Sequence, residues 1–131
     1  MDGLILFAHG ARNPDWARPF EAIAARLRAA HPERPLALAY LELMQPDLAT
    51  AAQALLTQGC TRVHILPMFL GASGHVRRDL PPRVQELAER HPQVQWLLHD
   101  AIGEQARVID AMAAAVQDLI SAAPAAGSPS R

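Results

Sequence analysis

Four short apolar runs, each followed by a segment with helical periodicity, form the basic pattern of the chain. The runs are Leu4–Ala8, Leu36–Leu41, Val63–Leu66 and Val94–Leu98. The first two runs are uninterrupted, which is typical of strands that are covered on both faces, and the last two each contain one polar residue. Apolar residues spaced three and four positions apart predict helices over residues 14–30, 46–58, about 79–91 and 103–121. The pattern therefore predicts four alternations of strand and helix.

Residues that favour helix ends support these boundaries. Asn13-Pro14 offers an N-cap followed by proline at the first helical position, and Pro46-Asp47 opens the second helix. Gly59 is placed to be the left-handed residue that follows a helix. The third helix is expected to begin within Asp79–Pro82, because proline is tolerated in a first turn but disrupts a helix interior.

The alternation of elements defines the fold class. Parallel strands joined by right-handed helical crossovers form a sheet with helices on both faces. We therefore expect an α/β protein, a single doubly wound domain with a four-stranded parallel sheet of order 2-1-3-4. The domain is expected over residues 1–122, and residues 123–131 are expected to form a disordered C-terminal tail.

Three polar side chains follow the first three predicted strands. His9 comes directly after the first strand, Glu42 after the second, and His75 lies in a glycine-rich loop after the third. Sheets of this kind bind ligands at the carboxyl ends of their strands. Because adjacent strands lie about 4.8 Å apart, residues that leave neighbouring strand ends can converge on one ion or one flat ligand. In the order 2-1-3-4, His9 lies between the other two.

These three residue types suit metal chemistry. Two imidazoles and a carboxylate are suitable ligands for a divalent first-row metal, and three protein ligands leave positions open for water or substrate. Each residue also has a simpler interpretation. His9 could be satisfied by backbone at a strand end, Glu42 could cap the following helix, and His75 could be an ordinary loop residue. Their common placement on one edge favours a site.

The rim of this edge also carries arginines and a glycine turn. Of the arginines near it, we select Arg12 and Arg77 over Arg18 and Arg78 as candidates for binding an anionic ligand. The turn Gly71–Gly74 could instead hold a phosphate, although the chain has neither a P-loop lysine nor the dinucleotide-binding glycine pattern. His9-Gly10 after a strand also resembles the histidine phosphatases, but Ala8 stands where those enzymes have a phosphate-binding arginine.

The other histidines are interpreted differently. His31 and His91 precede prolines at helix ends and His64 lies within a strand, so we expect structural roles for these three. His99 follows the fourth strand and is a weaker candidate for the same edge.

Composition and charge argue against several classes of function. A chain of 131 residues that is 50% hydrophobic can bury one core. A formal net charge of −1 and a pI near 6.6 give no general attraction to nucleic acid or to a membrane surface. The single cysteine, Cys60, is expected to be a small apolar residue, which suits a reducing compartment. The first apolar run is too short for a signal segment or a membrane span, so we expect a cytoplasmic protein.

With these residues identified, the chain resembles the small CbiX/SirB-type sirohydrochlorin chelatases, members of the class II chelatase family. The resemblance covers about residues 3–120. It rests on His9-Gly10-x-Arg12, on Leu41-Glu42 with Pro46, and on the third block, Pro67-x-Phe-Leu70 with Gly74-His75-Val76 and Asp79-Leu-Pro81. Family members commonly have serine where Ala11 stands and isoleucine where Leu80 stands.

The resemblance implies a chelatase-like domain that inserts Co²⁺, Fe²⁺ or Ni²⁺ into sirohydrochlorin, for cobalamin, sirohaem or a related nickel cofactor. The metal is then a substrate, and no permanently bound cofactor is implied. His9 and His75 would serve as metal ligand and base in an order that stays open, and Glu42 as third ligand or proton acceptor. Tetrapyrrole carboxylates would contact the substrate-binding residues, which are Arg12, Ser73, Gly74 and Arg77. Larger family members contain two copies of this unit, so a homodimer is expected. The alternative is a non-catalytic tetrapyrrole- or metal-binding carrier.

Overall fold

The computed structural model of the protein describes residues 1–71 and 74–124, with the side chain of His75 outside the description. The strands are β1 (Asp2–Ala8), β2 (Leu36–Tyr40), β3 (Arg62–Pro67) and β4 (Gln95–Leu98). The α-helices are α1 (Arg18–Ala30), α2 (Leu48–Thr57), α3 (Gly74–Arg90) and α4 (Ala106–Ser121). Two short 3-10 helices, η1 (Pro14–Ala17) and η2 (Ile102–Glu104), precede α1 and α4.

The strands form one parallel sheet of order β2-β1-β3-β4, which confirms the predicted fold class and strand order. In the register of the sheet, Leu4 of β1 lies opposite Leu36 of β2 and His64 of β3. β1 and β3 are the central strands, and their side chains Ile5 and Ile65 are fully buried. The ends of β1, β2 and β3 therefore lie next to one another at the carboxyl edge.

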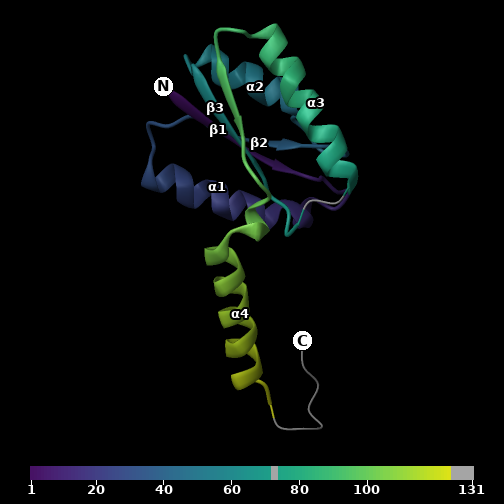
Figure 1. Ribbon diagram of the computed structural model, residues 1–131. Coiled ribbons are helices and arrows are strands. Elements are labelled where there is room, and N and C mark those ends of the chain that lie inside the picture. Colours follow the sequence, from purple (N-terminus) through teal and green to yellow (C-terminus); the bar gives the residue numbers. More distant parts are fainter. Residues whose placement is uncertain (72–73, 125–131) are drawn as a thin grey trace.

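Each face of the sheet has its own core. On one face, Ile65 packs with Leu55 of α2 and Leu80 of α3. On the other face, Leu6 packs with Ala24 of α1. Figure 1 shows α1 on one side of the strands and α2 and α3 on the other. This arrangement confirms that helices cover both faces, and it leaves the carboxyl edge between them accessible.

The predicted helix ends are largely confirmed. The Asn13 side chain accepts a hydrogen bond from the backbone N–H of Asp15, and the Asp47 side chain accepts one from Thr50, both at 2.9 Å. Asn13 caps the 3-10 helix η1, so the first four residues of the predicted helix 14–30 are not α-helical and α1 starts at Arg18. Gly59 follows α2 with a φ of 94°, a backbone conformation that strongly favours glycine. These local signals are read correctly from sequence because each is satisfied by neighbours a few residues away.

Helix α3 begins earlier than predicted. It starts at Gly74, so His75 lies in the first turn of a helix and not in a loop, and Pro81 and Pro82 lie inside the helix. An interior proline removes a backbone hydrogen bond, which is why the sequence pattern favours a later start. Tertiary packing offsets this loss. The Leu80 side chain is only 4% exposed, and it packs in the core and so holds the first turns of α3 against the sheet.

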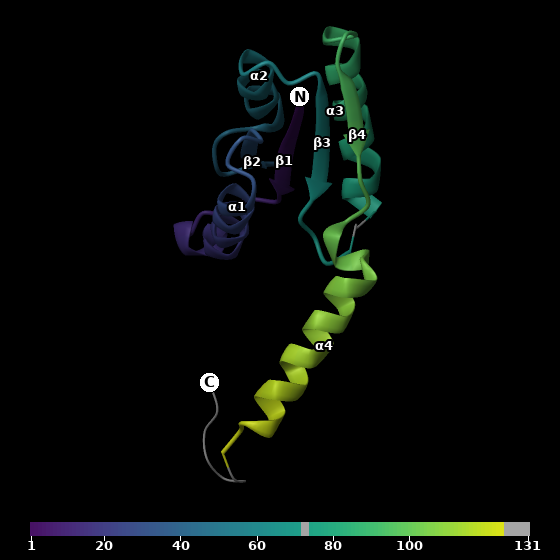
Figure 2. The same ribbon diagram turned by 90° about the vertical axis from the view of Figure 1, so that its left-hand side faces the viewer.

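Helix α4 differs most from expectation. Its α-helical part starts at Ala106, after the separate turn η2, and Figure 1 and Figure 2 show it extending away from the sheet. In the part of the chain that the structure describes, none of its residues is buried. Its large apolar side chains are exposed, namely Ile109 (54%), Met112 (46%), Val116 (56%), Leu119 (73%) and Ile120 (64%). Most of the predicted tail, residues 125–131, lies outside the described residues.

None of the helices within the described ranges combines the length and the apolar character that crossing a membrane would require.

The cap of α2 gives a stability prediction. The hydrogen bond from the Thr50 backbone N–H lowers the pKa of Asp47 below its ordinary value of 3.8. Asp47→Ala should therefore lower the free energy of unfolding by about 1 kcal/mol at neutral pH, whereas Asp47→Asn, which keeps a capping oxygen, should lower it less. Urea denaturation followed by circular dichroism measures both.

The pH dependence checks the cause. A carboxylate with a lowered pKa contributes stability that is complete above its unfolded-state value and is lost as the pH falls through the folded-state value. The difference between wild type and Asp47→Asn should thus shrink as the pH is taken below 3.8. A difference that stays constant with pH would show that the charge of Asp47 contributes nothing.

Candidate functional site

The backbone ladder between β1 and β2 continues past the ends of both strands. Leu41 N–H donates to the carbonyl oxygen of Ala8 at 2.9 Å, and Glu42 N–H donates to the carbonyl oxygen of His9 at 3.1 Å. Gly10 then turns away with a φ of 97°, and a Cβ at this position would collide with the backbone oxygen of Glu42. The main chain therefore fixes His9 and Glu42 as neighbours.

The two side chains meet above this backbone. His9 Nε2 lies 3.2 Å from Glu42 Oε1, and the side chains are 49% and 56% exposed. The predicted proximity of His9 and Glu42 at the carboxyl edge is thus confirmed. Because both side chains are half exposed, the pair is open to solvent and to an incoming ion or ligand.

The third member of the predicted triad comes from α3. The backbone of His75 lies in the first turn of this helix, immediately after Gly74. Its side chain and the whole of Ser73 lie outside the described residues, so their predicted roles remain predictions. Among the described side chains, no group of three or more His, Cys, Asp or Glu residues is placed to hold a metal ion. Of the three predicted metal ligands, the described side chains show His9 and Glu42 next to each other.

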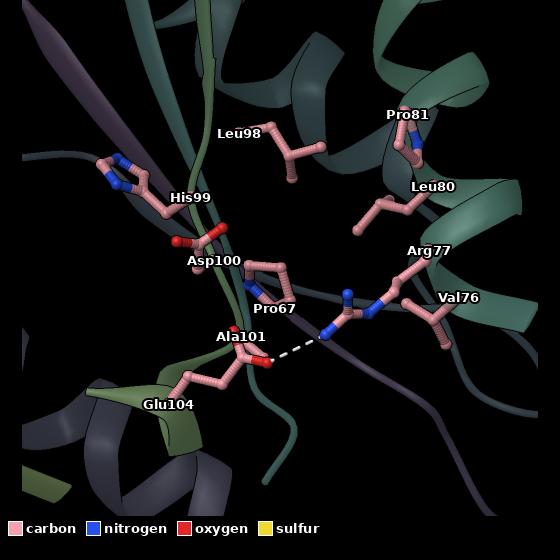
Figure 3. Close-up of a pocket in the computed structure, with 10 residues that line it drawn as sticks. All are labelled: Pro67, Val76, Arg77, Leu80, Pro81, Leu98, His99, Asp100, Ala101 and Glu104. Atoms are coloured by element: carbon pink, nitrogen blue, oxygen red, sulfur yellow. Dashed lines mark hydrogen bonds and ion pairs between the residues drawn. The ribbon is translucent and has the colours of Figure 1, made fainter. Parts of the chain in front are cut away.

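A cavity of about 310 Å³ opens beside the first turns of α3. Figure 3 shows Arg77 and Leu80 of α3 facing Leu98, Asp100 and Glu104 across it. The Arg77 guanidinium donates to Glu104 Oε1 at 3.3 Å across the mouth. The cavity combines an apolar wall with charged groups, which is the usual composition of a small-ligand site. Within the described residues its lining includes neither His9 nor Glu42, so the carboxyl edge has two separate parts.

The arginines of the rim divide into different environments. Arg12 follows β1 and is exposed, whereas Arg18 forms an ion pair with Asp15 at 3.2 Å. Arg78 donates to the carbonyl oxygen of Gly74 one turn earlier in α3, and Arg77 faces the cavity. The structure therefore places Arg77 at the cavity, and its role in binding an anionic ligand stays a prediction. The Arg77–Glu104 contact was not predicted, because no local sequence signal relates two residues in separate elements.

His64 and His99 form a second polar cluster that the sequence interpretation missed. His64 Nε2 lies 3.1 Å from Asp2 Oδ2, and His64 Nδ1 lies 2.9 Å from His99 Nε2. The hydrogen bond from His64 lowers the pKa of Asp2 below 3.8, and Arg62 adds to this effect. His99 also lines the cavity, yet Figure 3 shows its ring directed away from the cavity centre. The cluster therefore links neighbouring strands instead of extending the edge site.

Cys60 behaves as expected from sequence. Its side chain is free and belongs to the core, with 3% exposure. Burial raises the pKa of the thiol, which keeps it protonated and poorly nucleophilic.

The geometry permits two kinds of chemistry. A neutral imidazole next to a carboxylate can take up and pass on a proton, and the same two groups can together bind a divalent cation. The fold and the edge thus define an open doubly wound α/β protein with a histidine–carboxylate pair at its ligand-binding edge. A model of the CbiX family matches residues 3–119, and the chain belongs to this family.

Three known proteins show the extent of the similarity. The sirohydrochlorin ferrochelatase of Priestia megaterium is 30% identical over 110 residues, which make up 84% of this chain and 41% of that protein. The crystal structure of a CbiX protein from Marinobacter aquaeolei VT8 matches with a TM-score of 0.83 at 29% identity, over 94% of this chain and 100% of that one. The sirohydrochlorin chelatase SirB from Bacillus subtilis subspecies spizizenii, in complex with cobalt, matches with a TM-score of 0.72 at 25% identity, over 90% of this chain and 50% of that one. The chain thus spans half or less of the length of two of these relatives.

The contact between Gly10 and Glu42 can be tested by stability. Gly10→Ala should lower the free energy of unfolding by more than about 2 kcal/mol, because it adds backbone strain at positive φ and a collision with the Glu42 backbone. Gly59→Ala is the matched control, since its φ is also positive but a Cβ there meets nothing within 4 Å. Urea denaturation of both variants separates strain from collision. Equal losses would show that the close approach of Gly10 to Glu42 does not restrain the site.

Proposed function

We propose that this protein is an enzyme that inserts a divalent metal ion into sirohydrochlorin, a tetrapyrrole that bears eight carboxylates. The observation that carries the proposal is the exposed His9–Glu42 pair at the carboxyl edge of a CbiX-family sheet. The relatives from Priestia megaterium and Bacillus subtilis, which are named for chelation of sirohydrochlorin, support this choice of substrate.

The chemistry requires two things of the protein. The incoming ion must lose water, and two pyrrole N–H protons must leave the macrocycle. In this proposal His9 and His75 act as metal ligand and base, in an order that stays open, and Glu42 is the third ligand or accepts a proton. The 3.2 Å separation of His9 Nε2 and Glu42 Oε1 suits both uses of the pair. A half-exposed pair also suits an ion that must arrive and depart.

The tetrapyrrole would be held by its carboxylates. Arg77 at the mouth of the 310 Å³ cavity can exchange its contact with Glu104 for a substrate carboxylate, and the exposed Arg12 can bind another. Gly74 and Ser73 would contact the macrocycle beside His75. A cavity of this size is at the low end for a small-molecule site, so it would take part of the substrate while the ring lies along the edge.

The metal is a substrate in this proposal, and no resident cofactor is required. Cobalt, iron and nickel all suit imidazole and carboxylate ligands. Iron and cobalt have additional support, because the names of the two relatives contain one each. We assign the protein to the cytoplasm on the strength of its buried free thiol, which suits a reducing compartment.

Substitution of the edge residues tests the mechanism. His9→Ala and His75→Ala should each reduce metal insertion by at least about two orders of magnitude, the scale for loss of a positioned acid–base group. Glu42→Gln keeps the size and one acceptor but removes the charge, so it should weaken cobalt binding or proton removal more than tetrapyrrole binding. Rates are measured from the absorbance of sirohydrochlorin at saturating cobalt, iron or nickel, after subtraction of the uncatalysed rate.

His31→Ala and His91→Ala serve as matched controls at helix ends. They should change activity little and stability by about a few tenths of a kcal/mol. Circular dichroism confirms that each variant is folded. If His9→Ala and His75→Ala turned over like wild type, the proposed site would be wrong. Wild-type protein that binds both substrates without exceeding the uncatalysed rate would favour a carrier.

The assembly proposed is a homodimer. A single unit covers a large macrocycle on one side only, and the chain accounts for half or less of the length of two relatives. A second copy could provide the missing side.

Sedimentation velocity tests the assembly. The protein should sediment as a dimer at micromolar concentration, and metal insertion per chain should fall as dilution produces monomer. A monomer with full activity per chain would refute the homodimer while leaving the His9–Glu42 site intact.

A further inference from the structure

The apolar face of α4 has no cover among the described residues. Its members are Ile109, Met112, Val116, Leu119 and Ile120, each at least 46% exposed, and we call them the α4 stripe. Their spacing places them on one side of the helix, opposite Arg107, Ala114 and Asp118. An isolated helix of 16 residues is marginally stable in water, so a stripe of this kind needs a surface to pack against.

The sheet has one face that is only partly covered by a helix. On the face that carries α1, this helix packs against β1 and β2. Over β3 and β4 the same face presents Leu66 and Leu97, which are only partly buried, together with the polar side chains of Arg62, His64 and Gln95. One half of this face is thus covered by a helix and the other half is not. A doubly wound sheet normally has helices along both faces, so this half is one helix short.

The connection between β4 and α4 is anchored so that the helix leads away from its own sheet. Gly103 N–H donates to the carbonyl oxygen of Phe69 at 2.9 Å, and a Cβ at Gly103 would collide with the backbone of Leu70. Glu104 pairs with Arg77, which anchors η2 to α3. With η2 held in this way, α4 leaves the body beyond the ends of β3 and β4 (Figure 1, Figure 2). Folding back would require these contacts to break.

We propose that the α4 stripe packs on the α1-side face of β3 and β4 of a second copy of this chain, and that the two copies exchange α4 reciprocally. Such an exchange closes with two-fold symmetry and leaves no stripe exposed. A second copy is the occupant that the structure favours, because the same chain carries both the uncovered helix and the uncovered half-face. Two relatives also continue beyond the matched unit by at least its own length.

The exchange has a consequence for the site, and in this respect it rests on the proposed homodimer. α4 starts directly after the residues that line the cavity, Asp100, Ala101 and Glu104 among them, and it leads away from the carboxyl edge. When α4 starts at the carboxyl edge of one copy and packs on the sheet of the other copy, it brings the two carboxyl edges toward each other. The exchanged helices would then border the space in which a macrocycle is held between the copies.

Charge substitution on the helix tests the contact. Val116→Glu should raise the dimer dissociation constant by at least about tenfold, because a charge would be buried without a partner. Ala114→Glu is the matched control on the opposite side of α4, and it should leave the constant within about twofold of wild type. Sedimentation velocity gives both constants, and circular dichroism checks that each variant keeps its helices. A Val116→Glu protein that dimerises like wild type would overturn the proposal.

Cross-linking identifies the surface that α4 occupies. In a Cys60→Ala background, a tagged chain with Leu97→Cys is mixed with an untagged chain with Val116→Cys, and a short bismaleimide is added after subunit exchange. Reciprocal packing predicts a covalent product that joins tagged to untagged chain. Cross-links between two Val116→Cys chains instead would mean that α4 pairs with α4 and would overturn the exchange. A chain that carries both cysteines and cross-links only to itself at a concentration where the protein is a dimer would overturn it as well.

The outcomes separate this inference from the homodimer itself. A dimer that survives Val116→Glu and yields no mixed cross-link would leave the homodimer and its activity standing while refuting the exchange. A wild-type monomer with full activity per chain would refute both. Loss of activity in His9→Ala with unchanged cross-linking would bear on the chelatase site alone.

Discussion

The hydrogen bonds that extend the β1–β2 ladder beyond the two strands are the constraint on which the edge site depends. They carry the pairing from Ala8 and Leu41 on to His9 and Glu42, at the point where most parallel strands separate. Gly10 can leave this ladder because it has no Cβ to strike the Glu42 backbone. The His9 and Glu42 side chains are half exposed, and they lie 3.2 Å apart. Backbone hydrogen bonds, and not burial of the side chains, keep the two residues next to each other. The site stays open to a ligand and is nevertheless preorganised.

The part of the edge around the cavity is held by side-chain contacts and not by the β ladder. There the polar groups are attached to α3 and η2, which are joined to the sheet through Leu80, Gly103 and the Arg77–Glu104 ion pair. An exposed ion pair contributes little to stability, so Arg77 can change partners at low cost. One side of the edge is thus fixed by the sheet and the other by contacts that a charged ligand can replace. That division suits a reaction in which a large anionic molecule and a small cation arrive separately.

The sequence predicts what local chemistry and periodicity determine. Apolar runs identify the strands, and caps such as Asn13 and Asp47 identify helix starts, because their partners lie within a few residues. The proximity of His9 and Glu42 follows from strand order and strand ends. The start of α3 at Gly74 does not follow, since burial of Leu80 outweighs the preference of proline for a first turn. The direction of α4 and the Arg77–Glu104 contact depend on how η2 docks against residues after β3, and no periodic pattern encodes such docking.

When both rings are neutral, the contacts from Asp2 through His64 to His99 determine which nitrogen of each histidine carries the proton. An ionised carboxylate can only accept a hydrogen bond, so His64 must carry its proton on Nε2. In a neutral ring Nδ1 is then a lone pair, and His99 must donate to it from Nε2. The tautomer of a histidine at the cavity is therefore set by a carboxylate at the amino end of β1, on the same face of the sheet. Removal of the Asp2 carboxylate would free both rings to adopt the other tautomer, so the position of the ring proton of His99 depends on a side chain at the opposite end of the strands.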